Sequence, residues 1–262
     1  MTFELKTAAQ FDLMREAGLV VAMALSTLAE AVAPGITTAE LDRIAELQIR
    51  SAGATPSFKG YQGYPATICT SVNDEVVHAI PSQKRLRAGD LISIDCGAIV
   101  GGWHGDAAIT VGVGTITEEH EALLAACEAA LWQGIAQAWP GRRLGDVSSA
   151  VEQSVRQAGP FSLVDGYTGH GIGSQMHMDP PVPNRGTAGH GPRLVPGMAL
   201  AIEPMVTLGG PETAVLADDW TVVTADGRWA AHFEHTVAIT PAGPEVLTAF
   251  GGAILKNSKS SS

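Results

Sequence analysis

The sequence has few cysteines and few aromatic residues, and each shortage narrows the class of protein. Among 262 residues there are 3 cysteines, and aromatic side chains make up 5%. Cys69, Cys96 and Cys127 are odd in number, widely spaced and free of any CxxC pair, which argues against both a disulfide framework and a cysteine zinc site. We therefore expect a protein of a reducing compartment, the cytoplasm.

Basic residues and long apolar runs are also scarce. The chain has 16 Lys and Arg against 27 Asp and Glu, a formal net charge of -11, and no long run of basic residues. Nucleic acid and anionic membrane surfaces attract basic patches, so neither is an expected partner. No apolar run reaches the about 18 residues of a membrane span, and the N-terminus lacks a signal-peptide pattern. The 45% hydrophobic content is that of a soluble globular protein.

The stretch from Leu91 to Thr110 places two carboxylates on a predicted β-hairpin. Alternating residues over 91–100 and 103–111 flank a pair of glycines, a pattern typical of two strands and a turn. With a two- or four-residue turn centred on the glycines, Asp95 opposes Ala108, which shares a sheet face with Asp106. Diagonal neighbours lie roughly 7–8 Å apart. Two buried negative charges this close require positive charge between them.

The elements before the hairpin recur after it. A helix over 8–33, a second helix capped by Thr38, and a loop, strand and loop delivering His78 are predicted ahead of the hairpin. From Glu118 the pattern restarts with a helix through Trp139 and another from about Leu144 to Ala158, and the Pro-Gly pairs that precede the second helix of each half are offset by 106 residues. Such a constant offset indicates an internal repeat.

The repeat extends to the acidic residues of the hairpin. Asp95 in GDLISID aligns with Glu203 in GMALAIE at an offset of 108, and Asp106 in HGD aligns with Glu234 in HFE at an offset of 128. We predict an α+β fold of two helix-helix-hairpin halves, related by a pseudo-two-fold axis around a curved, mostly antiparallel sheet. The predicted single domain spans 1–250, with halves of about 8–112 and 118–240, followed by a flexible tail over 251–262.

Four converging carboxylates carry a charge that two divalent ions would neutralise. Such a pair of ions activates water and polarises the carbonyl that the water attacks, so hydrolysis is the predicted chemistry. The glycine-rich segment 169–173, GHGIG, would let the backbone bring His170 close as a nitrogen ligand. This ligand set suits manganese, iron or cobalt and does not exclude zinc.

Five ordered segments, GYPATICTSVNDEVVHAIP, SIDCGAIVGGWHGDAA, GHGIGSQMHMDP, AIEPM and FEHT, resemble the methionine aminopeptidases, in particular the short bacterial type I form with the pita-bread fold. The resemblance runs from the first helix to about Thr240. It implies that Asp95 chelates one ion, that Asp106 and Glu234 bridge both, and that His170 and Glu203 bind the second, with Glu203 also handling the proton of the attacking water. It further implies that His78 and His177 contact the substrate and stabilise the tetrahedral intermediate.

The resemblance also places a pocket for the methionine side chain, formed by Phe58, Tyr61, Tyr64, Cys69 and Trp220. Met176 departs from the family, whose members usually have an aromatic residue before the second histidine, and Phe58 stands where many relatives have cysteine. A flexible thioether is expected to loosen the pocket wall. We interpret the other histidines as structural or surface residues: His104, His120, His190, His232 and His235. His232 is the least certain of them, because it lies two residues from Glu234 on the same face of a strand.

Three functions fit this sequence to different degrees. The first is an enzyme that removes the initiator methionine from nascent polypeptides when the next residue is small, acting as a monomer with transient ribosome contact. The second is a proline-directed peptidase of the same fold, although such enzymes usually carry an additional N-terminal domain. The third is a binding protein that has lost activity, but such proteins lose ligands and every expected ligand is present here.

Overall fold

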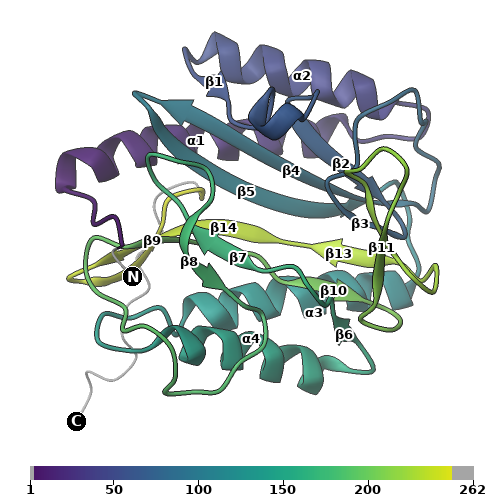
Figure 1. Cartoon of the computed structure of the whole chain (residues 1–262). Helices are drawn as coiled ribbons and strands as arrows, with labels where there is room; N and C mark the ends of the chain where they lie inside the picture. Colours follow the sequence, from purple (N-terminus) through teal and green to yellow (C-terminus); the bar gives the residue numbers. More distant parts are fainter. Residues whose placement is uncertain (1–2, 250–262) are drawn as a thin grey trace.

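The computed structural model describes residues 3–249, which form two helix pairs at opposite ends of a curved system of β-strands (Figure 1). The first pair lies against β4 and β5 and the second against β10 and β13. No helix within 3–249 has the length and apolar character needed to cross a membrane. The predicted tail over 251–262 lies outside the described residues. The helices are α1 (Ala8–Ala31), α2 (Thr38–Ser51), α3 (Glu118–Ile135) and α4 (Leu144–Ala158).

The strands form one nine-stranded sheet and two three-stranded sheets, with antiparallel pairing throughout the described residues. The large sheet has the order β1-β4-β5-β14-β9-β7-β8, with β2 added on β4 and β15 on β14; the small sheets are β13-β10-β6 and β11-β12-β3. The strands are β1 (Thr55–Pro56), β2 (Ile68–Val72), β3 (Glu75–Val77), β4 (Leu91–Val100), β5 (Trp103–Gly112), β6 (Ser162–Leu163), β7 (Gly169–Gly171), β8 (Met178–Val182), β9 (Ala199–Ile202), β10 (Met205–Thr207), β11 (Thr213–Val215), β12 (Val222–Thr224), β13 (Ala230–His232), β14 (Glu234–Thr240) and β15 (Gly243–Val246).

The first hairpin has the register that the sequence predicts. Val100 pairs with Trp103 around the two-glycine turn, and Asp95 pairs with Ala108. Both turn glycines have positive φ, 56° and 84°, a conformation that costs glycine little. Asp95 and Asp106 therefore lie on one face of β4 and β5. The two halves of the chain meet where Glu234 of β14 pairs with Ala108 of β5.

The second hairpin is divided, which the sequence interpretation did not anticipate. The counterpart of β4 is split into β9 and β10 at Glu203-Pro204, and the counterpart of β5 is split into β13 and β14 at Phe233. Pro204 has no N–H to donate to a neighbouring strand, so the ladder breaks there. The break leaves Glu203 directly after β9 and Glu234 at the start of β14, and both side chains line the same cavity.

Some boundaries differ from the predicted ones. The cap of α2 is Thr37, whose side chain accepts from the backbone of Glu40 while Glu40 bonds back to Thr37, so the assignment to Thr38 was wrong. α1 ends two residues before the predicted position, and α3 ends at Ile135 rather than at Trp139. The segment before His78 contains two strands, β2 and β3, where one was predicted.

The contact between α1 and β5 depends on glycine. A Cβ atom on Gly105 would lie 2.7 Å from the backbone nitrogen of Gly18, and a Cβ on Gly18 would clash with the carbonyl oxygen of Leu247. We expect Gly18→Ala to lower the free energy of unfolding by about 1–3 kcal/mol, because overpacking against backbone outweighs the better helix propensity of alanine. Urea unfolding measures this. Leu19→Ala, at an exposed position of the same helix, should change stability far less, and equal effects would contradict the packing argument.

Candidate metal centre and active site

A single cavity of about 300 Å³ collects every site residue predicted from the sequence. One end of the cavity is acidic and the other is apolar. Gln62 is the one lining residue that the sequence interpretation missed; it adopts a positive φ of 49° in the turn before Tyr64, and its sequence carries no signal for this. The lining residues are Phe58, Tyr61, Gln62, Tyr64, Cys69, His78, Asp95, Asp106, His170, Met176, His177, Glu203, Trp220 and Glu234.

Neighbouring polar groups fix the backbone of the acidic residues. The hydroxyl of Thr236 accepts from the backbone N–H of Asp106 at 3.0 Å and donates to its carbonyl oxygen at 2.8 Å, which ties β14 to β5. The side-chain amide of Asn184 donates to the carbonyl oxygen of Glu203 at 3.0 Å. The carboxylates are therefore held in place by contacts that do not use their own oxygens.

The carboxyl groups of the cluster lack the partners that buried charges need. Oδ1 of Asp95, Oδ1 of Asp106 and Oε1 of Glu234 are buried without a hydrogen-bond partner in the described part of the chain. Burial raises the pKa of Asp95 to about 7 and that of Glu203 to about 8. Burial, followed by repulsion from neighbouring carboxylates, raises the pKa of Asp106 and Glu234 well above the usual range. Bound cations would supply the missing partners.

His170 faces this cluster from β7. Its Nε2 lies 3.5 Å from Oε1 of Glu203 and 3.8 Å from Oδ2 of Asp106. Its Nδ1 lies 2.9 Å from the carbonyl oxygen of Gly171, so we assign the proton to Nδ1. Burial lowers the pKa of His170 to about 3, which keeps the ring neutral. A neutral imidazole with Nδ1–H bound to a carbonyl is a typical metal-ligand arrangement.

Two groups of residues have the spacing of metal ligands. One ligand atom each from Asp106, His170 and Glu234 lies within 4.8 Å of the others, and the same holds for Glu203, His232 and Glu234. With the orphaned carboxylate oxygens, these residues fit divalent cations. The structure thus brings His232 into the cluster, as its place on the same strand face as Glu234 allowed. The interpretation of His232 as a structural or surface residue stays a prediction.

Aromatic and sulfur side chains form the other end of the cavity. Phe58, Tyr64, Cys69 and Met176 are buried together. The hydroxyl of Tyr64 donates to the carbonyl oxygens of Ile68 and Ala79, and its ring meets Trp220 edge-on with centroids 5.0 Å apart. Such surroundings suit an unbranched apolar side chain, especially a thioether. The predicted loosening by Met176 stays a prediction.

The two remaining histidines stand between the acidic and apolar ends. Nδ1 of His177 lies 3.0 Å from the hydroxyl of Tyr61, and its ring is 4.2 Å from that of His170 between centroids. His78 follows β3 with a φ of 62°, which few residues other than glycine adopt, and this turns the chain at the cavity wall. Burial lowers the pKa of His177, and that of His78 to about 4. Both rings are therefore neutral near pH 7.

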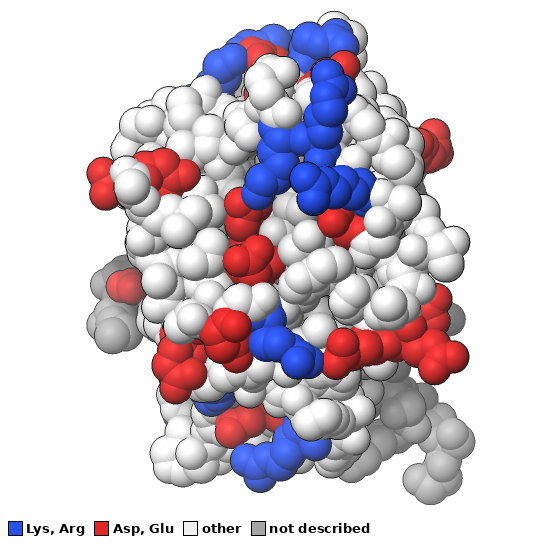
Figure 2. All heavy atoms as spheres, turned by 90° about the vertical axis from the view of Figure 1, so that its right-hand side faces the viewer, with Lys and Arg blue, Asp and Glu red and all other residues white. Residues whose placement is uncertain are grey.

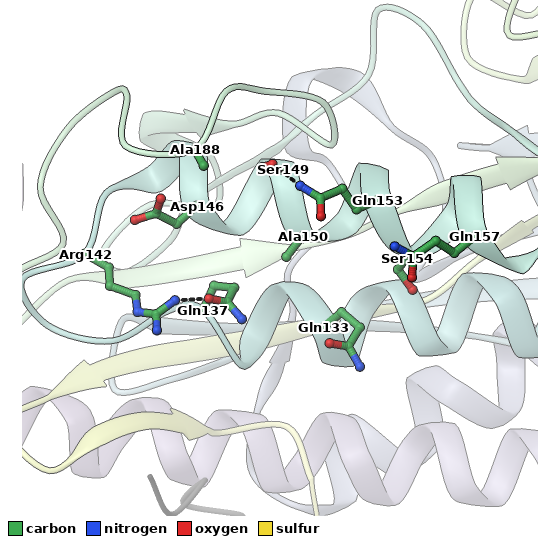
Figure 3. A pocket seen from close by; sticks show the side chains of 10 residues that line it. All are labelled: Gln133, Gln137, Arg142, Asp146, Ser149, Ala150, Gln153, Ser154, Gln157 and Ala188. Atoms are coloured by element: carbon green, nitrogen blue, oxygen red, sulfur yellow. Dashed lines mark hydrogen bonds between the residues drawn. The ribbon is translucent and has the colours of Figure 1, made fainter. Parts of the chain in front are cut away.

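A second, larger hollow of about 490 Å³ lies between α3 and α4 and shares no lining residue with this cavity. Figure 3 shows that glutamine and serine side chains dominate it. Its acid, Asp146, accepts from the backbone N–H groups of Arg143 and Gly189, and its cation, Arg142, contacts Gln137. The hollow contains no cluster of metal ligands among the described residues. The smaller cavity, which collects titratable groups with shifted pKa values, is therefore the candidate active site.

The metal-free protein is expected to lose stability as the pH rises from about 6.5 to about 8. The carboxyl groups of Asp95 and Glu203 have folded-state pKa values of about 7 and about 8, above the unfolded values. Their contribution is present at low pH and is lost as the pH rises through these folded-state values. The buried histidines, whose pKa values are lowered, oppose this loss close to pH 6.5, where an unfolded imidazole is still half protonated. The carboxyl groups of Asp106 and Glu234, whose pKa values are raised well above the usual range, add to the loss. We expect a loss of about 1–3 kcal/mol in urea unfolding with chelator present.

Saturating divalent metal serves as the control for this pH dependence. A bound cation keeps the carboxylates ionised and stabilises the folded state, so the decline should become shallower or reverse. Greater stability of the metal-free protein at pH 8 than at pH 6.5 would contradict the placement of these acids.

Comparison with known proteins finds similar sequences and structures. The model of metallopeptidase family M24 matches residues 12–241. Methionine aminopeptidase 1 of Mycobacterium tuberculosis is 56% identical over 249 residues, which cover 93% of this chain and 94% of that protein. The crystal structure of methionine aminopeptidase from Thermotoga maritima superposes with a TM-score of 0.92 at 41% identity, covering 94% of this chain and 99% of that one.

The chain therefore belongs to metallopeptidase family M24. Within that family it belongs to the methionine aminopeptidases of bacterial type, and it is a metal-dependent hydrolase with methionyl aminopeptidase activity. Family membership implies the use of divalent metal. The predicted pita-bread fold is confirmed. Prolidase from Pyrococcus furiosus has a TM-score of 0.77 at 22% identity and is covered to 65% of its length, a likeness of fold alone.

Proposed function

We propose that the protein removes the initiator methionine from nascent proteins and peptides when the second residue is small and uncharged, by attack of water on the first peptide bond. The observation that carries this proposal is the joining of a buried acidic cluster and an aromatic, thioether-lined pocket in one cavity. The pocket would hold the methionine side chain, which places the first peptide bond beside the carboxylates and histidines.

The acidic end would hold two divalent ions: manganese, iron or cobalt, with zinc as a further candidate. Asp95 would chelate one ion, His170 and Glu203 would bind the other, and Asp106 and Glu234 would bridge them. Bound divalent ions lower the pKa of water and polarise a carbonyl group. The unpartnered oxygens of Asp95, Asp106 and Glu234 support this assignment.

The remaining steps belong to protein side chains. Glu203, ionised once metal is bound, would take the proton of the attacking water and pass it to the departing amine. We infer that Tyr61 donates its hydroxyl to Nδ1 of His177, which leaves Nε2–H of His177 free to donate. His78 and His177, as neutral donors, would then stabilise the oxyanion of the tetrahedral intermediate.

We further propose that the protein is a monomer of the cytoplasm that meets nascent polypeptide N-termini through a transient ribosome contact. Figure 2 shows Lys and Arg side chains gathered over the upper part of one face and acidic side chains below them. Such a mixed surface on a chain of net charge -11 supports a weak contact rather than tight nucleic-acid binding.

A peptide panel tests the proposed selectivity. Free methionine should be released from Met-Ala and Met-Gly peptides, and release from Met-Lys and Met-Leu peptides should be much slower. Cleavage confined to peptides with proline in second position would favour the proline-directed alternative. Metal binding without turnover of any peptide would overturn the proposal and favour the third alternative, a binding protein that has lost activity.

A further inference from the structure

One buried imidazole in the acidic cluster has no role in the proposed mechanism. His232 ends β13 and is 1% exposed. Its Nε2 is buried without a hydrogen-bond partner in residues 3–249. The same atom lies 3.5 Å from Oε2 of Glu203 and 4.0 Å from Oε2 of Glu234. A buried polar atom that is unsatisfied and faces carboxylates requires an explanation.

The repeat counterpart of His232 provides a comparison within the same chain. His104 precedes Asp106 by two residues, as His232 precedes Glu234. Nδ1 of His104 forms a hydrogen bond of 3.0 Å with the hydroxyl of Ser57, so its ring has a partner within the protein. His232 has no such side-chain partner. Structural packing accounts for one histidine of the pair and leaves the other unexplained.

Hydrogen bonds to Thr110 fix the backbone of His232. The hydroxyl of Thr110 accepts from the N–H of His232 and donates to its carbonyl oxygen, each at 2.8 Å. Since that donation uses the proton of Thr110, the hydroxyl of Ser93, also at 2.8 Å, must donate to Thr110. These bonds hold the residue on the strand and leave the side chain aimed at the acids, as a preorganised ligand would be.

We propose that His232 is a sixth protein ligand of the metal centre and binds, through Nε2, an ion shared with Glu203 and Glu234. The proposal rests on the metal centre of the proposed function and adds a ligand to it. The two groups of metal-ligand spacing both contain Glu234, and each contains one imidazole, His170 in the first and His232 in the second. Because the proposed function assigns Glu203 and His170 to one ion, His232 would bring a second nitrogen to that ion.

A second nitrogen changes which metals the centre prefers. Carboxylate oxygens suit hard ions such as Mn²⁺, and imidazole favours Co²⁺ and Zn²⁺, which stand higher in the order of affinities. His232→Gln should therefore weaken Co²⁺ binding at one of two positions by about 10- to 100-fold or more. Mn²⁺ affinity should fall less, so the preference for Co²⁺ over Mn²⁺ should shrink.

The test uses the full-length protein, stripped of metal by chelator and titrated with Co²⁺ and with Mn²⁺ in a calorimeter. A second readout counts imidazole ligands directly, because the N–H proton of an imidazole bound to Co²⁺ gives a strongly shifted, solvent-exchangeable proton resonance. The wild type should show two such resonances at saturation and His232→Gln one. His235→Gln is the matched control, since His235 lies three residues further along, in β14, and its Nδ1 bonds to the hydroxyl of Thr248 instead; it should keep both.

The outcomes separate this proposal from the proposed function. Two ions in the wild type with a single shifted resonance, or unchanged Co²⁺ affinity in His232→Gln, would overturn the role of His232 and leave the metal centre intact. A wild type that binds no Co²⁺ in the cavity would overturn both. The resonance count of the wild type decides the matter even when His232→Gln does not fold.

Discussion

Replacing Glu234 by glutamine is expected to abolish metal binding and turnover together. Glu234 is the acid common to both groups of metal-ligand spacing, and its Oε1 has no hydrogen-bond partner within the described chain. Glutamine offers one neutral oxygen in place of a charged carboxylate. Metal affinity should fall by more than the about 10- to 100-fold that loss of an outer partner causes. Metal analysis and kcat/KM on a Met-Ala peptide measure the two losses.

Glu245→Gln is the matched control for this variant. Glu245 is also buried, but it lies on β15, which pairs with Val237–Thr240 of β14, and its carboxylate pairs with Arg15 at 2.7 Å. Its loss should reduce stability and leave metal content unchanged. A Glu234→Gln protein that kept its metal and its rate would show that Glu234 does not bridge the ions.

His177→Ala is expected to lower the rate of peptide cleavage without changing the metal content of the protein. His177 lines the cavity and contacts Tyr61, and it belongs to neither group of metal-ligand spacing. Loss of one oxyanion donor typically costs about 10²–10³ in kcat. The variant should therefore retain full metal content and lose about that factor in rate, with a smaller change in KM. Steady-state kinetics with parallel metal analysis is the measurement.

His190→Ala controls for the general effect of removing a histidine. His190 is exposed and lies outside the cavity, with Nδ1 near the carbonyl oxygen of Ala188. Its removal should leave kcat unchanged. Full activity in His177→Ala would contradict the assigned role, and loss of metal in that variant would move His177 into the ligand set.

Local rules account for the parts of the fold that the sequence predicted. The register of β4 and β5 follows from a two-glycine turn and from strand alternation, so Asp95 and Asp106 could be placed on one face without a structure. The helix pairs follow from apolar periodicity and from the Pro-Gly stops. Glu203 and Glu234 followed from the repeat, which transfers the logic of the first hairpin to the second.

Long-range contacts account for what the sequence did not predict. Pro204 stands directly after Glu203, but only the structure shows that the second hairpin separates there and pairs with different strands on each side. The placement of His232 depends on that separation, because its strand, β13, pairs with β10 while Glu234 begins β14. Gln62 lines the cavity because it adopts a positive φ in a turn, and glutamine does not predict that conformation.

The acidic cluster makes function and stability depend on the same ions. Four buried carboxyl groups with raised pKa values oppose folding when ionised. Bound cations convert this repulsion into attraction, so metal binding and folding are thermodynamically linked. The division into one catalytic domain with halves of about 8–112 and 118–240 stays a prediction that folding studies of the separate halves can address.

Counting metal ions during chelation and re-addition tests the central claim most directly. The protein is stripped with chelator, titrated with Mn²⁺, Fe²⁺, Co²⁺ or Zn²⁺, and followed by metal analysis and release of methionine from a Met-Ala peptide. The account predicts that activity vanishes on stripping and returns as the carboxylate cluster fills, with up to two ions per chain. Full activity in a protein shown to hold no divalent metal would contradict it.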